Sequence, residues 1–174
     1  MPGARTAPAT AALLHPGAGG APPPQTAPAP PGMPETAFAP MPRIYRDGWI
    51  DFNKNGRKDV YEDRAAAIDA RVADLLAQMD TDEKTAQMAT LYGYGRVLED
   101  PLPTKAWKRA LWKDGMGNID EMHNGWDKGG VLPYSTDIRS HVWAMDEVQR
   151  FFVEQTRLGI PVDFTNEGIR GIEV

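Results

Sequence analysis

The segment from Thr156 to Gly171 reads Thr-Arg-Leu-Gly-Ile-Pro-Val-Asp-Phe-Thr-Asn-Glu-Gly-Ile-Arg-Gly, and it passes directly from a predicted helix into a predicted strand. Gly159 and Pro161 end the helix, because glycine commonly closes a helix and proline cannot continue one. The mostly apolar residues from Ile160 to Phe164 predict a short buried strand, with Pro161 tolerated at its start. A helix followed at once by a buried strand is typical of an α/β fold.

Helices are predicted where apolar residues recur at the spacing of one helical face. This spacing predicts a helix over about residues 141–158, which leads into the strand, and an earlier helix over about residues 63–78. Asp80 is followed three residues later by Glu83, which is the pattern of a helix N-terminus. A second helix is therefore predicted to begin after Asp80 and to end before Gly93.

The remaining parts of the folded region are predicted to be turns and loops. Asp47-Gly48 interrupts a short aromatic stretch over residues 44–50 and indicates a turn. The region from about residue 93 to 137 is rich in Gly, Pro and Trp, and we interpret it as long loops around one strand near residues 116–119. Loops of this length in a compact domain usually serve a function.

The first part of the chain has a different composition from the rest. Ala, Pro, Gly and Thr dominate up to about residue 42, and large apolar residues are almost missing there. Such a segment cannot bury enough surface to offset chain entropy. We therefore expect a disordered tail or linker over residues 1–42 and one folded unit over residues 43–174.

Composition and charge exclude several classes of function. The net charge of −5 argues against nucleic acid as a partner, because phosphate binding needs a basic face. No apolar run reaches the roughly 20 residues that span a bilayer, and the absence of cysteine excludes zinc–thiolate sites. Residues 7–14 are the only candidate for the apolar core of a signal peptide and are short for it. Because a Pro/Ala/Gly-rich tail often follows an export signal, a periplasmic or secreted location is the expectation.

A calcium-type loop lies just ahead of the first predicted helix. The stretch Asp51-Phe-Asn-Lys-Asn-Gly-Arg-Lys-Asp-Val-Tyr-Glu62 fits the twelve-position calcium-loop pattern at every specified place. A hard divalent cation needs several oxygen ligands at about 2.4 Å, and a loop that winds around it presents every second residue. The predicted ligands are the side chains of Asp51, Asn53, Asn55, Asp59 and Glu62 and the backbone carbonyl of Arg57.

Two other interpretations of this loop remain open. Asn-x-Asn-Gly is favourable turn chemistry without any metal, so the stretch also fits a solvated turn. A signalling EF-hand fits less well, because no amphipathic helix enters the loop and Lys58 occupies the inward eighth position. The predicted role is structural, with Ca²⁺ fixing the polypeptide ahead of the first helix.

Three segments together resemble the N-terminal region of glycoside hydrolase family 3, the β-glucosidase and β-xylosidase family. Residues 71–88, with the sequence Arg-Val-Ala-Asp-Leu-Leu-Ala-Gln-Met-Asp-Thr-Asp-Glu-Lys-Thr-Ala-Gln-Met, are similar to the helix pair that opens these enzymes. Asp114-Gly-Met-Gly-Asn-Ile119 resembles the glycine-marked first strand, and Thr156–Gly171 resembles the second strand with its following loop. The calcium-type loop also resembles a subset of these proteins, and the resemblance extends over about residues 45–174.

The resemblance implies the fold and the substrate site. The family has a (β/α)8 TIM-type barrel, typically of about 250 residues, so the chain is expected to supply the opening portion of that barrel. Glu167 matches an acidic position that hydrogen-bonds hydroxyls of the non-reducing-end sugar, a task that suits a carboxylate. A plain surface acid is the alternative for Glu167. Arg170 stands where the family often has His, and it would either line the sugar pocket or pair with Glu167.

The resemblance also implies which parts of the machinery lie elsewhere. Retaining glycosidases use two carboxyl groups about 5–5.5 Å apart, and in this family the nucleophilic Asp and the acid/base Glu come from further downstream. We therefore expect no catalytic residue within these 174 residues, and a β-glycoside or oligosaccharide substrate that also contacts downstream parts of the same polypeptide. The alternative is a non-enzymatic, calcium-stabilised extracellular module that binds carbohydrate or a partner. No organic cofactor is expected.

Overall fold

The computed structural model describes residues 28–31, 38–92, 104, 105, 109, 113–122 and 138–166. In chain order the elements are the 3-10 helix η1 (Pro42–Ile44), strands β1 (Tyr45–Arg46) and β2 (Trp49–Ile50), the 3-10 helix η2 (Val60–Glu62), helices α1 (Ile68–Gln78) and α2 (Thr81–Gln87), strands β3 (Thr90–Tyr92) and β4 (Asn118–Asp120), helix α5 (Ile138–Gln155) and strand β5 (Asp163–Thr165). The described part of the chain is thus a mixed α/β structure.

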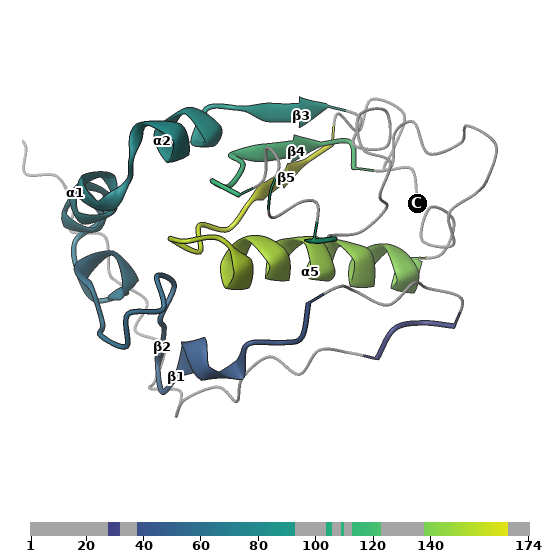
Figure 1. The fold of residues 1–174 in the computed structure, drawn as a ribbon, viewed down its shortest axis with the longest axis horizontal. Helices are drawn as coiled ribbons and strands as arrows, with labels where there is room; N and C mark the ends of the chain where they lie inside the picture. Colours follow the sequence, from purple (N-terminus) through teal and green to yellow (C-terminus); the bar gives the residue numbers. More distant parts are fainter. Residues whose placement is uncertain are drawn as a thin grey trace, which may run out of the picture.

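The centre of the fold is a parallel sheet with α5 against one face (Figure 1). Its strand order is β3-β4-β5, and Leu91, Ile119 and Phe164 stand opposite one another in the register. Ile119 is fully buried, and all three side chains pack with the inner face of α5, which includes Val148 and Phe152. The alternation of side chains along each strand therefore gives the sheet one apolar face, which is turned toward α5.

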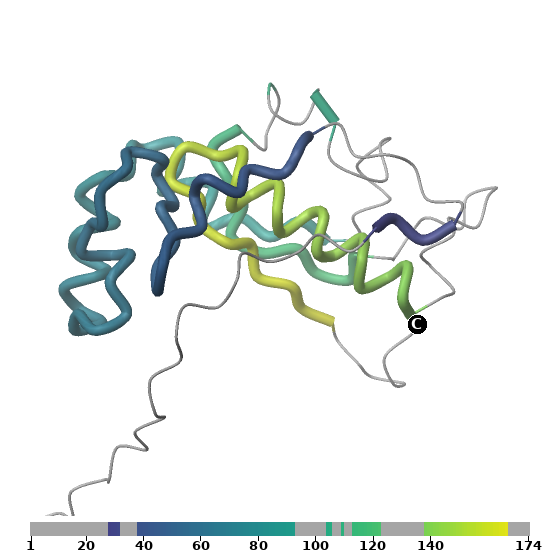
Figure 2. The backbone as a smooth tube through the Cα atoms, turned by 90° about the horizontal axis from the view of Figure 1, so that it is seen from below, coloured from purple at the N-terminus to yellow at the C-terminus, as the bar shows by residue number. Residues whose placement is uncertain are grey.

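The N-terminal segment from Phe38 to Tyr45 runs along α5 on the side away from the sheet (Figures 1 and 2). The ring of Phe38 lies 5.5 Å from that of Phe151, and the Met41 N–H donates to Glu154 Oε2 at 3.0 Å. The Tyr45 hydroxyl donates to Glu154 Oε1 at 3.1 Å. The contacts with α5 therefore include Phe38 and Met41, which lie ahead of residue 43, where the folded part was predicted to begin.

The type of each of these predicted elements agrees with the structure, whereas the residues at which an element begins or ends agree less well. The turn at Asp47-Gly48 joins the antiparallel pair β1 and β2, and the capping box of Asp80 and Glu83 opens α2. Helix α1 ends where predicted but begins at Ile68, because the residues before it form η2 and turns.

The ends of the later elements differ from the predicted ones. The second helix ends before Gly93, as predicted, but it already ends at Gln87 because the chain then enters β3. Helix α5 is shifted toward the N-terminus by about a turn relative to residues 141–158, and β5 begins at Asp163 instead of Ile160. Pairing with β4 decides where β3 and β5 lie, and local periodicity carries no information about that pairing.

The predicted barrel needs more strands than the structure describes. Within the described ranges the parallel sheet has three strands in an open order, so the barrel stays a prediction. None of the described helices has both the length and the apolar character needed to cross a bilayer.

Candidate calcium-binding loop

The loop from Asp51 to Glu62 follows the β1–β2 pair directly, winds tightly and ends in η2. Lys54 and Gly56 both have left-handed backbone conformations, with φ of 62° and 79°. The side-chain oxygen of Asn53 accepts the N–H of Asn55 at 3.2 Å, and that of Asn55 accepts the N–H of Arg57 at 2.7 Å. Successive Asx turns of this kind fold a chain back on itself at every second residue, which is the spacing that a cation-binding loop requires.

Asp51 begins the loop and is the most deeply buried of the predicted ligands. It is 2% exposed, and its Oδ2 accepts the Gly56 N–H at 2.9 Å. The guanidinium of Arg46 lies 3.6 Å from the same oxygen. The other oxygen, Oδ1, is buried and has no hydrogen-bond partner among the residues that the structure describes. An ionised oxygen buried without a partner is costly, so this atom fits a position beside a cation.

Glu62 ends the loop and ties it to its beginning. It is 3% exposed; its Oε1 accepts the Phe52 N–H at 2.7 Å and its Oε2 accepts the Asp59 N–H at 2.9 Å. Burial raises the pKa of the Glu62 carboxyl, an effect opposed by these backbone N–H groups and reinforced by the nearby Asp51 carboxylate. A bound cation would offset the cost of keeping this buried carboxyl ionised.

Asp59 is hydrogen-bonded to both asparagines of the loop. The amide nitrogens of Asn53 and Asn55 donate to Asp59 Oδ2 at 2.6 and 2.7 Å. The structure therefore brings Asn53, Asn55 and Asp59 together on one side of the loop. Arg57, predicted to offer its carbonyl, lies on the exposed outer turn.

The carboxylates of Asp51, Asp59 and Glu62 do not form a preformed metal-binding cluster. In the part of the chain described here, no group of three His, Cys, Asp or Glu side chains is placed to hold a metal ion. Asp51 and Asp59 take separate partners, Gly56 N–H for one and the asparagine amides for the other. The donor set of carboxylates, amides and a carbonyl still consists of the hard oxygen ligands that Ca²⁺ prefers, and the unpartnered Asp51 oxygen fits it.

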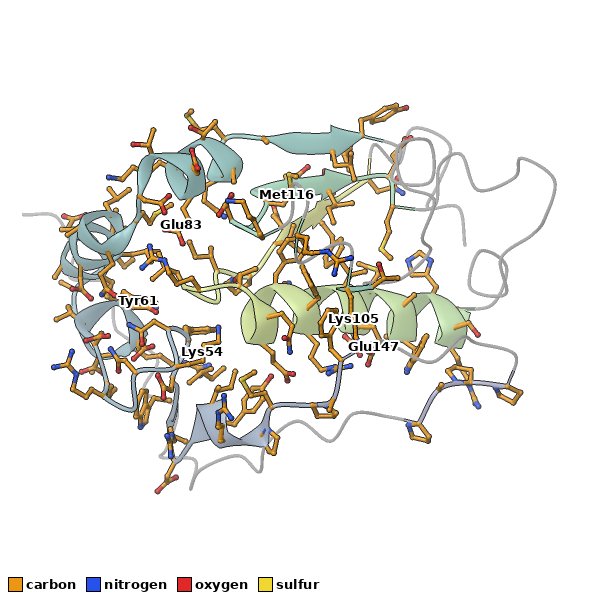
Figure 3. The ribbon with its side chains drawn as sticks, viewed as in Figure 1. Lys54, Tyr61, Glu83, Lys105, Met116 and Glu147 are labelled. Atoms are coloured by element: carbon orange, nitrogen blue, oxygen red, sulfur yellow. The ribbon has the colours of Figure 1, made fainter. Side chains whose placement is uncertain are left out.

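The loop is docked on the C-terminal end of α5, which the sequence did not predict. The Lys54 ammonium donates to the carbonyls of Val153 and Thr156 at 2.8 and 2.6 Å (Figure 3). A Cβ on Gly159, which has a φ of 60°, would come within 2.6 Å of the Phe52 carbonyl, so the two backbones touch. No local pattern distinguishes Lys54 from Lys58, whose ammonium instead meets Asp63 at 2.7 Å.

A second clamp joins α2 to the end of α5. The guanidinium of Arg157 donates through Nε to Glu83 Oε1 at 2.9 Å and through Nη2 to the Gln78 carbonyl at 2.9 Å. Glu83 is 3% exposed and also accepts the Asp80 N–H as part of the capping box. The sequence predicted Glu83 as a capping residue. Its partner Arg157 lies just beyond α5 and is distant in the chain, so no local pattern predicts the pairing.

The predicted sugar-binding residues Glu167 and Arg170 lie outside the described residues. Their roles stay predictions, as do those of the calcium ligands.

No protein-family model matches the chain, and no curated protein matches it. The family resemblance therefore rests on the sequence motifs alone and enters below as a proposal.

Proposed function

We propose that the chain forms the calcium-stabilised opening portion of the catalytic barrel of a retaining β-glycosidase. The observation that supports this most directly is the parallel pairing of β4 with β5, with α5 between them in sequence and packed on one face of the sheet. The segments that resemble glycoside hydrolase family 3 include these two strands. Parallel strands joined through a helix are the repeating unit of such barrels.

Glu167 supplies the sugar contact in this proposal. It follows β5 shortly after its last residue, Thr165. In parallel α/β folds, ligands bind outside the carboxyl ends of the strands. A carboxylate there accepts charge-assisted hydrogen bonds from neighbouring sugar hydroxyls, and these bonds strengthen as the ring distorts toward the transition state. Arg170 lines the same pocket or pairs with Glu167. The nucleophile and the acid/base come from the downstream part of the polypeptide.

The cation has a structural role in this proposal. The ligands that would hold Ca²⁺ at the loop are Asp51, Asn53, Asn55, Arg57, Asp59 and Glu62. When bound, the cation compensates the carboxylates of Asp51, Asp59 and Glu62. The loop's own ammonium groups at Lys54 and Lys58 already have partners outside these ligands, on α5 and on Asp63. Lys54 then keeps the loop in contact with the end of α5.

The test is hydrolysis of aryl β-glucosides and β-xylosides by the complete protein. Replacement of Glu167 by Ala should lower kcat/KM by at least about 100-fold, because a transition-state contact is lost. Asp163→Ala is the matched control, since Asp163 is an exposed acid at the opposite end of β5. Unchanged turnover in Glu167→Ala contradicts the sugar contact. A complete protein that binds sugar but hydrolyses no glycoside supports the alternative of a calcium-stabilised binding module.

A further inference from the structure

The sheet has a second face that is polar. Register partners on parallel strands point to the same side of a sheet. The row of Leu91, Ile119 and Phe164 faces α5. The rows on either side of it therefore face away from α5, and they consist of Thr90, Asn118 and Asp163 at the amino ends of the strands and Tyr92, Asp120 and Thr165 at the carboxyl ends.

This polarity is unusual for parallel strands. Such strands are normally covered on both faces, and they then have apolar residues at nearly every position. Here Tyr92 is the only large apolar side chain in the two rows, and it is 45% exposed. A face of this kind is suited to water or to a polar ligand, and a packed apolar layer would leave its carboxylates and hydroxyls without partners.

The row at the carboxyl ends is held in place by hydrogen bonds. The Thr165 hydroxyl donates to Asp120 Oδ1 at 2.7 Å and lies 3.2 Å from Asn118 Oδ1. The N–H of Glu121 donates to the Thr165 carbonyl at 2.9 Å, which ties the end of β4 to the end of β5. Among the residues that the structure describes, the side-chain hydrogen bond of the Asp120 carboxylate is made through Oδ1. One carboxylate oxygen is thus used to orient the group, and the other takes no part in that bond.

We infer that Tyr92, Asp120 and Thr165 form a subsite for the hydroxyl groups of the sugar; this rests on the proposed glycosidase function. Asp120 Oδ2 accepts a hydroxyl proton in a charge-assisted bond. The Thr165 oxygen, whose own proton is given to Asp120, accepts from a second hydroxyl. The Tyr92 ring offers an apolar surface to the C–H groups of a pyranose and keeps a polar tip. Glu167 follows Thr165 closely in the chain, so this row extends the predicted sugar site.

The experiment measures both catalysis and binding in the complete protein. Asp120→Asn keeps the size of the side chain and an acceptor for Thr165 but removes the charge. It should lower kcat/KM for the p-nitrophenyl β-glucoside or β-xyloside by about 10- to 100-fold, and it should weaken the calorimetric affinity for glucose or xylose in parallel. Thr165→Val should have a smaller effect in the same direction. Asp163→Asn, at the amino end of the same face, should match the parent in both measurements.

The outcomes separate this inference from the function on which it rests. If Glu167→Ala impairs hydrolysis while Asp120→Asn and Thr165→Val match the parent, the subsite is wrong and the glycosidase function stands. If the parent binds sugar without hydrolysing glycosides and Asp120→Asn loses that binding, the subsite stands and the hydrolase function fails. If the parent neither binds nor hydrolyses, both fail. An equal loss in Asp163→Asn also overturns the subsite, because it would reflect the charge of the whole face.

Discussion

At the scale of one residue, Asp51 supports the proposal that the loop binds a cation. Its carboxylate is almost fully buried, yet the nearest guanidinium, that of Arg46, is 3.6 Å away and its side chain is 44% exposed. An ion pair with such a solvent-screened partner contributes little. The Gly56 N–H satisfies Oδ2, and Oδ1 is left without a partner in the described structure. A divalent cation at Oδ1 would compensate both the charge and the missing contact.

Calcium should therefore stabilise the protein through this residue. At a concentration about 100 times its dissociation constant, a ligand that binds only the folded state adds about 2.7 kcal/mol to the free energy of unfolding. We expect Ca²⁺ to raise the melting temperature of the parent by several degrees relative to chelator, and Asp51→Asn to abolish most of that rise. Differential scanning calorimetry with Ca²⁺ and with chelator measures it.

The control for this prediction is Asp47→Asn. Asp47 is an exposed acid in the β1–β2 turn, close to the loop in sequence but not among its ligands. This variant should respond to Ca²⁺ as the parent does. Identical melting of the parent in Ca²⁺ and in chelator would instead mean that the stretch is the solvated Asx turn, and the metal would be removed from the proposal.

Residue-level prediction from the sequence succeeded where the signal is local. The Asx turns of the loop, the bend at Gly56 and the capping box of Asp80 and Glu83 depend on residues only a few positions apart. The metal ligands of the loop stay a prediction. The unpartnered oxygen of Asp51 and the partner of Lys54 depend on the folded structure. The carbonyls that hold Lys54 are those of Val153 in α5 and of Thr156 just beyond it, about a hundred positions later in the chain, and nothing in either segment encodes that pairing.

At the scale of elements, Lys54 joins the loop to α5. The last carbonyls of a helix have no partner within the helix and carry partial negative charge, so a cation there is favourable. Lys54 places its ammonium against two of them from a left-handed position in the loop. The Phe52 carbonyl touches Gly159 just beyond the helix. The conformation of the loop and the position of the end of α5 are therefore fixed together.

Replacement of Lys54 by Met should lower the free energy of unfolding by about 1–3 kcal/mol, because the hydrogen bonds of a charged group to the helix end are lost. Urea unfolding followed by circular dichroism measures it. Lys58→Met is the matched control, since Lys58 belongs to the same loop but pairs with Asp63 at the surface. Its cost should be much smaller, because an ion pair at the surface is screened by solvent. Equal effects of the two variants would contradict the docking role of Lys54.

Elements were predicted well when they are long and poorly when they are short. Helix α5 has enough turns for its apolar spacing to be recognised. Strand β3 has the residues Thr90 to Tyr92 only, and it follows α2 almost directly, so its alternation cannot be distinguished from a continuing helix. Its pairing with β4, which lies much later in the chain, makes it a strand. For the same reason the polar row at the carboxyl ends of the strands could not be predicted from the sequence.

At the scale of the whole molecule, α5 lies between the sheet and the N-terminal segment from Phe38 to Tyr45 (Figures 1 and 2). The segment covers a charged group on α5, in which Arg150 pairs with Glu147 and Glu154. Arg150 also donates to the Phe38 carbonyl at 3.3 Å. Burial raises the pKa of the Tyr45 hydroxyl, and the adjacent Glu154 carboxylate raises it further. Buried charges need their full set of partners, and here the N-terminal segment supplies part of that set.

Removal of the covering segment should therefore destabilise the protein. A protein that begins at Thr36 keeps Phe38 and Met41 but loses Pro28–Pro31, which line a pocket with the start of α5, and its urea unfolding is the reference for this comparison. One that begins at Arg43 loses the contacts of both residues with α5, and its free energy of unfolding should fall by at least about 2 kcal/mol. Phe38→Ala in the complete protein separates ring packing from the backbone contacts, because it keeps the carbonyl that Arg150 binds. If the protein that begins at Arg43 is as stable as the one that begins at Thr36, the segment only lies on α5, and the charged group there is sufficiently solvated without it.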